Sequence, residues 1–219
     1  MRIALLLLLG VGGPALAANR LPPCPPPHPQ LFLSPMGEPF RAAAGAADPV
    51  GAWFARADAD HDGQITLAEM VADADRFFTA LDVNGDGELL PDEVTRYERD
   101  VAPEVQLYVS RPNPFGMGAR SERTRKRPSR KSLEYGGAMG AGRYAFLNIP
   151  EPVAAADADL NRAVDRDEFR KTAVRRFGQL DTARAGRLTL ATLPRTPAQA
   201  AASDCDPTRV AEKTKGSRR

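Results

Sequence analysis

Two acidic stretches of the chain have the residue types and spacing that bind a divalent cation. In DADHDGQITLAE (residues 58–69, loop 1), carboxylates stand at positions 1, 3, 5 and 12, with glycine at position 6. Calcium is a hard cation that takes about 6 to 8 oxygen ligands. We expect it to be bound here by the side chains of Asp58, Asp60 and Asp62, the carbonyl of Gln64, and bidentate Glu69.

A second loop of the same pattern, DVNGDGELLPDE (residues 82–93, loop 2), begins 24 residues after the first. Its expected ligands are Asp82, Asn84, Asp86, the carbonyl of Glu88, and Glu93. Position 9 holds Leu90, whereas loop 1 has Thr66 there to contact a water ligand. We therefore expect loop 1 to bind most tightly and loop 2 next.

A third loop, DADLNRAVDRDE (residues 157–168, loop 3), departs from the pattern at position 6. Its expected ligands are Asp157, Asp159, Asn161, the carbonyl of Ala163, and Glu168, while Asp165 adds charge at position 9. Arg162 stands where loops 1 and 2 have glycine, and a left-handed backbone costs such a residue about 1 to 2 kcal/mol. Loop 3 should consequently bind about 5 to 30-fold more weakly than a loop with glycine there.

The stretch DTARAGRLTLAT (residues 181–192, loop 4) keeps the spacing of these loops without their ligands. Asp181 is its only carboxylate, because Ala183, Ala185 and Thr192 occupy the other acidic positions. It retains glycine at position 6 and Leu188 at position 8, through which paired loops form a short antiparallel bridge. We expect loop 4 to bind no calcium and to bury an apolar face of its neighbour.

The residues around the loops support one repeated helix-loop-helix unit. The residue four places before each loop is apolar in every case: Phe54, Phe78, Val153 and Phe177. Residues 48–193, without the middle segment, resemble the EF-hand, calmodulin-like superfamily. Some exported bacterial EF-hand proteins are similar in having SPMGEPF before the first hand and a basic insert between lobes. The resemblance implies a helical, calcium-binding fold with two loop-paired lobes.

We accordingly predict an all-α fold of two paired EF-hand lobes with short antiparallel loop-loop bridges, joined by a long, basic, flexible insert. Asp48 and Pro49 predict the cap and first residue of a helix that turns Trp53 and Phe54 inward, whereas prolines restrict the helix before loop 3 to about one turn. The expected boundaries are a signal peptide at 1–18, a mobile proline-rich arm at 19–47, one EF-hand pair at 48–101, the insert at 102–147, the second pair at 148–195 and a disordered tail at 196–219.

The N-terminus, MRIALLLLLGVGGPALAANR, has the pattern of a secretory signal peptide. Arg2 precedes an apolar core, and Ala15 and Ala17 form a small-residue cleavage pattern. The apolar run is shorter than the roughly 20 residues of a membrane span, although an uncleaved anchor is the alternative. We expect a periplasmic or secreted bacterial protein without a transmembrane span after cleavage.

The middle segment is strongly basic between residues 120 and 131. Seven of these twelve residues are cationic: Arg120, Arg123, Arg125, Lys126, Arg127, Arg130 and Lys131. One interpretation is a solvated connector that offsets the acidic loops; the other is contact with an anionic envelope component or a protein partner. Nucleic acid is not expected, because the net charge is only +2 and no aromatic residue interrupts the basic run to stack on bases.

The remaining reactive residues do not form a second site. Cys24 and Cys205 could form one disulfide in an oxidising compartment, with free or intermolecular thiols as alternatives. No nucleophile and base stand in a catalytic pattern, so we do not expect an enzyme. The sequence favours an exported calcium buffer or sensor; the alternative is an envelope interaction protein in which calcium is structural and residues 120–131 make the contact.

Overall fold

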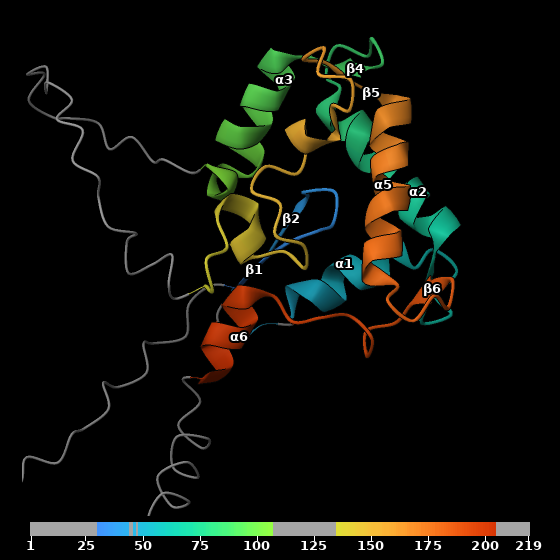
Figure 1. Cartoon of the computed structure of the whole chain (residues 1–219), viewed down its shortest axis with the longest axis vertical. Helices are drawn as coiled ribbons and strands as arrows, with labels where there is room; N and C mark the ends of the chain where they lie inside the picture. Colours follow the sequence, from blue (N-terminus) through green and yellow to red (C-terminus); the bar gives the residue numbers. More distant parts are fainter. Residues whose placement is uncertain (1–29, 44–45, 47, 107–134, 205–219) are drawn as a thin grey trace, which may run out of the picture.

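The computed structural model describes residues 30–43, 46, 48–106 and 135–204 (Figure 1). The longer elements are the hairpin of β1 (Gln30–Leu33) and β2 (Pro39–Ala42), and the helices α1 (Pro49–Ala57), α2 (Leu67–Leu81), α3 (Pro91–Arg96), α5 (Arg166–Leu180) and α6 (Pro197–Asp204). The short strands are β3 (Ile65–Thr66), β4 (Glu88–Leu89), β5 (Val164–Asp165) and β6 (Arg187–Leu188). The short helical turns are η1 (Tyr97–Val101), η2 (Pro103–Val105), η3 (Gly140–Arg143) and η4 (Ala154–Ala156).

The helices before loops 1 and 3 form as their local sequences predict. The Asp48 side chain accepts a hydrogen bond from the Val50 N–H, and Pro49 is the first helical residue of α1. Trp53 and Phe54 on this helix are buried. Before loop 3, η4 is a single 3-10 turn, because Pro150 and Pro152 lack the N–H groups that a longer helix would use.

The loops pair differently from the prediction. Loop 1 pairs with loop 4, since Ile65 in β3 lies opposite Leu188 in β6. Loop 2 pairs with loop 3, since Leu89 in β4 lies opposite Val164 in β5. The prediction that loop 1 pairs with loop 2, and loop 3 with loop 4, was therefore wrong.

The spacing of the loops explains this pairing. Only 12 residues separate loop 1 from loop 2, and the single helix α2 takes all of them, so α2 is both the exit helix of loop 1 and the entry helix of loop 2. Its 15 residues span about 22 Å, whereas bridged strands lie about 5 Å apart. Helix α5 separates loops 3 and 4 in the same way. Because α2 and α5 lie side by side and antiparallel, each loop meets one from the other half of the chain (Figure 1).

The residues of both predicted lobes share one core. The ring of Phe169 on α5 packs against Phe78 on α2, with centroids 5.5 Å apart. At the surface of the same contact, Arg170 Nε donates to Asp75 at 2.8 Å, and Arg166 lies over the Phe78 ring. Such exposed pairs add little free energy, so burial of the aromatic residues supplies most of the stabilisation. The two lobes predicted at 48–101 and 148–195 are one packed unit.

The proline-rich arm was predicted to be extended and mobile, which is wrong for residues 30–43. These residues form the hairpin β1–β2, whose Phe32, Leu33 and Met36 are buried. The Phe32 ring packs on Trp53 of α1 with centroids 5.5 Å apart. This aromatic contact holds the hairpin against the first hand. Residues 19–29 of the predicted arm lie outside the described residues.

The segment SPMGEPF, residues 34–40, forms the turn of this hairpin and the first two residues of β2. Gly37 has φ +100°, and a Cβ added there would lie 2.6 Å from Pro152 Cγ and 2.7 Å from the Tyr97 hydroxyl oxygen. Only glycine fits this close approach. The Tyr97 hydroxyl donates to the Gly37 carbonyl at 2.8 Å, so the turn is joined to the helical end that follows loop 2.

The insert and the tail were also predicted to be unstructured, and both contain ordered parts. Residues 102–106 and 135–147 include η2 and η3, in which Val105 and Ala141 are buried. The tail contains α6, which begins after buried Thr196. The predicted signal peptide at 1–18, the basic residues at 120–131, Cys24 and Cys205 lie outside the described residues.

Arg176 forms a buried polar contact that joins three segments. Its side chain, on the inner face of α5, is 1% exposed. Nη1 donates to the Pro35 carbonyl and Nη2 to the Pro152 carbonyl, both at 2.8 Å. Burial lowers the pKa of Arg176 to about 10, which leaves the guanidinium charged at neutral pH. It thereby binds the hairpin turn and the segment before loop 3 to α5.

Glu151 is the second ionisable group of this buried region. Burial, the largest cause, and the charge of Glu98 together raise its pKa to about 7, against the opposing effects of the Ala154 and Val153 N–H groups and Arg176. Its Oε1 accepts no hydrogen bond from the described residues. The carboxyl group is therefore held in a site that favours its protonated form.

Glu151 should make the fold less stable as pH rises. Its pKa of about 7 in the fold exceeds the ordinary value of 4.5, so its stabilising contribution is complete below about pH 4.5 and is lost as pH rises through about 7. The loss should be about 3 kcal/mol. Urea unfolding across this range should show it as a difference between the wild type and Glu151→Gln. Parallel pH profiles for the two proteins would contradict this assignment.

Candidate metal centres

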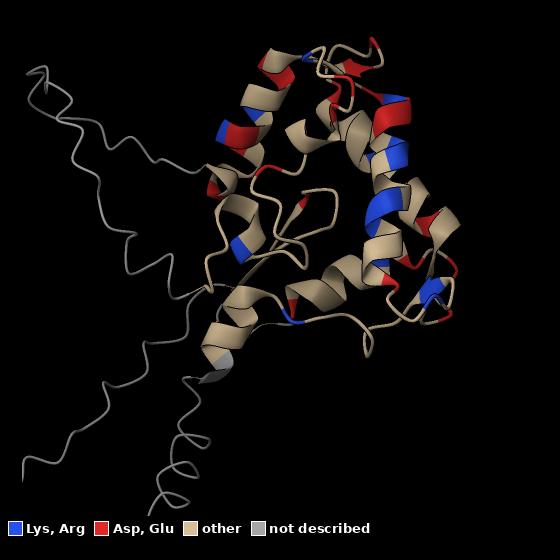
Figure 2. Ribbon diagram, viewed as in Figure 1, with Lys and Arg blue, Asp and Glu red and all other residues tan. Residues whose placement is uncertain are grey.

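Three of the loops bring their acidic side chains together. In each loop the side chains at positions 1 and 12, and one more between them, offer oxygens that all lie within 4.8 Å of one another. The three groups are Asp58, Asp60 and Glu69 in loop 1; Asp82, Asp86 and Glu93 in loop 2; and Asp157, Asp159 and Glu168 in loop 3. Acidic residues lie at both ends of the α2–α5 pair, around β4 and β5 and around β6 (Figure 2).

Backbone donors hold the carboxylates of loop 1 toward its interior. Glu69 Oε1 accepts from the Ala59 N–H at 2.9 Å, and its Oε2 accepts from the Thr66 N–H at 2.8 Å. Asp58, which is 5% exposed, accepts from the N–H groups of Asp62 and Gly63. The Thr66 N–H holds the pKa of Glu69 below its usual range. Glu69 is therefore ionised at neutral pH, as a cation ligand must be.

Loops 2 and 3 repeat this arrangement. Glu93 Oε1 accepts from the Val83 N–H at 2.7 Å, and Glu168 Oε1 accepts from the Ala158 N–H at 2.9 Å. Their second oxygens accept from the N–H groups at position 9, Leu90 and Asp165. Each glutamate thus spans its loop from the last position back to the second.

The other side chains predicted as ligands accept hydrogen bonds within their own loops. Asp62 accepts from the N–H and the side-chain amide of Gln64 and lies outside the acidic group of loop 1. Asn84 Oδ1 accepts from the Asp86 N–H at 2.9 Å, and Asn161 Oδ1 accepts from the Ala163 N–H at 2.7 Å. Of the residues with predicted carbonyl ligands, Glu88 begins β4, whereas Gln64 and Ala163 immediately precede β3 and β5.

All four loops share one backbone conformation. Positions 4 and 6 have positive φ in each loop; these are His61 and Gly63, Gly85 and Gly87, Leu160 and Arg162, and Arg184 and Gly186. The predicted left-handed conformation of Arg162 is confirmed, with φ at 75°. Loop 4 therefore keeps the backbone of a metal-binding loop although it lacks the ligands.

The internal hydrogen bonds of the acidic loops recur in loop 4. Asp181 accepts from the Ala185 N–H at 2.8 Å and from the Gly186 N–H at 2.7 Å. Thr192 Oγ1 accepts from the Thr189 N–H at 3.1 Å, in the position where the other loops use glutamate. Buried Leu188 completes the bridge to loop 1. Loop 4 supports loop 1 structurally and offers a single carboxylate.

The oxygen atoms that the three acidic loops offer as ligands fit calcium. Asp157 Oδ1 is buried and accepts no hydrogen bond from the described residues, while its other oxygen accepts from the Arg162 N–H at 3.0 Å. A buried carboxylate oxygen without a partner is costly, and a cation in the loop would satisfy it. The side chains gathered here are carboxylates, and such oxygen ligands suit calcium better than zinc or copper.

Arg162→Gly is expected to tighten calcium binding in loop 3 roughly tenfold. Glycine adopts the left-handed backbone without the penalty of about 1.4 kcal/mol that we assign to arginine. Calcium titration of the variant by calorimetry, with the change assigned to loop 3 by NMR, measures this. Unchanged affinity in loop 3 would show that the backbone penalty does not limit binding there.

Comparisons with known proteins support the motif at the first hand. A family model described as EF hand matches residues 50–72, which include loop 1 and parts of its two flanking helices. The chain has no match among curated proteins or solved structures. The EF-hand motif is therefore supported by both the sequence pattern and the loop geometry.

Proposed function

We propose that the protein binds calcium in loops 1, 2 and 3 and uses loop 4 only to support loop 1. The observation that carries this proposal is that three separate acidic groups form around positions 1 and 12 of loops that share positive φ at positions 4 and 6. The EF-hand match at residues 50–72 supports it. Calcium would neutralise carboxylates that otherwise repel one another across each loop.

The proposed role is that of an exported, non-catalytic calcium buffer or sensor. The proposal of export rests on the signal-peptide pattern of residues 1–18. None of the helices in the described part of the chain is long and apolar enough to cross a membrane. Extracellular calcium modules bind at about 0.1 to 1 mM, and a tenfold excess of calcium would stabilise the fold by about 1.4 kcal/mol per site.

Isothermal titration calorimetry of the whole chain with calcium tests the proposal. We expect binding at three sites, with loop 1 tightest, and almost none when Glu69, Glu93 and Glu168 are all changed to glutamine. Magnesium serves as the control cation, because its demand for octahedral geometry fits these loops poorly. Absence of calcium binding at about 1 mM would contradict the proposal.

A second candidate function is an envelope interaction protein in which calcium is structural. It is favoured by the seven cationic residues between positions 120 and 131. Deleting these twelve residues should abolish association with anionic vesicles or envelope fragments and leave calcium affinity unchanged. Retained association would support the connector interpretation instead.

A further inference from the structure

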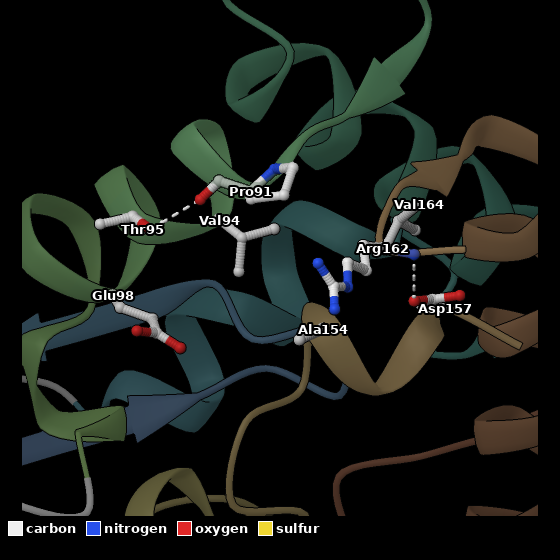
Figure 3. Close-up of a pocket in the computed structure, with 8 residues that line it drawn as sticks. All are labelled: Pro91, Val94, Thr95, Glu98, Ala154, Asp157, Arg162 and Val164. Atoms are coloured by element: carbon white, nitrogen blue, oxygen red, sulfur yellow. Dashed lines mark hydrogen bonds between the residues drawn. The ribbon is translucent and has the colours of Figure 1, made fainter. Parts of the chain in front are cut away.

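A pocket of about 370 Å³ lies between α3 and the segment that contains η4 and loop 3. Apolar side chains of Val94, Ala154 and Val164 line it (Figure 3). Glu98 and Arg162 add opposite charges to the lining, and Asp157 of loop 3 adds a second carboxylate, whose Oδ2 accepts from the Arg162 N–H. The pocket thus combines an apolar surface with one cationic and two acidic groups, contributed by different halves of the chain.

The presence of arginine at position 162 is not explained by the conformation of loop 3. The other three loops have glycine at the same position, where φ is positive, so arginine there costs conformational energy. Its guanidinium points into the space beside Val94 and Ala154 (Figure 3). Among the residues that the structure describes, the guanidinium has no hydrogen-bond or ion-pair partner. A strained position therefore presents to the pocket a cation that has no partner in the described part of the chain.

Glu98 contributes a negative charge to the pocket, opposite in sign to that of Arg162. It lies on the continuation of α3, on the other side of Val94 from Arg162 (Figure 3). Its side chain also has no ion-pair partner among the described residues. A ligand that matches this lining has an anionic group, an apolar group and a cationic group in that order.

The openness of the pocket favours side chains presented by a larger partner. Ala154 and Arg162 are exposed, as are Pro91 and Thr95 on the α3 side. A small molecule generally binds where about 70 to 90% of its surface can be buried. A shallow pocket with exposed walls covers less than this, whereas a polypeptide gains further contacts around the rim.

We propose that this pocket docks a polypeptide segment through an acidic side chain paired with Arg162. The planar guanidinium can donate two parallel hydrogen bonds to a carboxylate. An apolar side chain of the same segment would cover Val94, and a basic side chain would pair with Glu98. Docking at this pocket is a property beyond calcium binding. Because Arg162→Gly is also expected to change the calcium affinity of loop 3, all proteins are compared both at saturating calcium and without calcium.

Fluorescence anisotropy with two labelled peptides tests the proposal on the full chain. The first, Lys-Ala-Leu-Ala-Glu, places its three recognition side chains on one face of an extended segment. The second differs only by glutamine in place of glutamate. We expect the wild type to bind the glutamate peptide about tenfold more tightly than the glutamine peptide, and Arg162→Gly to lose this preference.

Arg184→Gly is the matched control protein. Arg184 is an exposed arginine at a positive φ in loop 4, which is not part of the pocket, so this variant removes the same charge and a similar strain. It should keep the wild-type preference for the glutamate peptide. The proposal would be overturned by any of three results: equal binding of the two peptides by the wild type, equal loss of the preference for the glutamate peptide in Arg162→Gly and Arg184→Gly, or no peptide binding at about 1 mM.

Discussion

Glu93→Gln is expected to weaken calcium binding in loop 2 about 100-fold and in loop 3 about threefold to tenfold, while loop 1 is unchanged. The first effect follows from removing the charge of the bidentate ligand, equivalent to about 2.7 kcal/mol. The second follows from the bridge between β4 and β5, because Leu89 and Val164 are paired within it. A loop that no longer closes around its cation loses part of its support for its neighbour.

Amide signals in NMR spectra report each loop separately. The amide N–H groups of Gly63, Gly87 and Arg162 donate to the first aspartate of loops 1, 2 and 3, respectively. Calcium titrations followed at these three amides therefore give three affinities. Glu69→Gln is the matched control, since its loop pairs with the ligand-poor loop 4 and should change alone. A loss in loop 1 with loop 3 unchanged in Glu93→Gln would contradict the pairing.

Arg176→Met is expected to destabilise the fold by about 3 kcal/mol. Methionine fills much of the buried space but donates no hydrogen bond, which leaves the carbonyls of Pro35 and Pro152 without their donor. Each buried acceptor left unsatisfied costs about 1 to 3 kcal/mol. Urea unfolding at constant calcium and pH measures the change.

Arg175→Met is the matched control for this variant. Arg175 is the exposed neighbour on the same helix, and among the described residues its side chain donates only to Thr172. We expect a change within about 0.5 kcal/mol, as for most surface substitutions. Equal destabilisation by the two substitutions would show that Arg176 does not join the hairpin turn to α5.

The conformation of the loops and the gathering of their acidic side chains could be predicted because both depend on residues close together in the sequence. Twelve consecutive residues carry both the carboxylates and the residues that form the turn, as loop 1 shows from Asp58 to Glu69. The loop pairing depends on contacts far apart in the sequence, and the resemblance led to the wrong partners. The spacing of loops 1 and 2 was sufficient to exclude their pairing, because the continuous helix between them keeps their bridging residues apart.

The sequence also contains patterns that indicate the β1–β2 hairpin and the burial of Arg176. The apolar stretch at residues 31–33, followed by a Pro-Met-Gly turn and then Phe40, is typical of a hairpin with a short loop. On α5, Arg176 shares helical spacing with buried Phe169, Ala173 and Leu180, which places it on the apolar face. The carbonyl partners of Arg176 lie in other segments, so the sequence could not identify them.

A crystal structure determined in the presence of calcium tests the central proposal most directly. We expect one ion in each of loops 1, 2 and 3, contacted by Asp58 and Glu69, by Asp82 and Glu93, and by Asp157 and Glu168, with no ion in loop 4. An ion at Asp181 together with none at Asp58 would contradict the assignment of calcium sites from their carboxylate ligands.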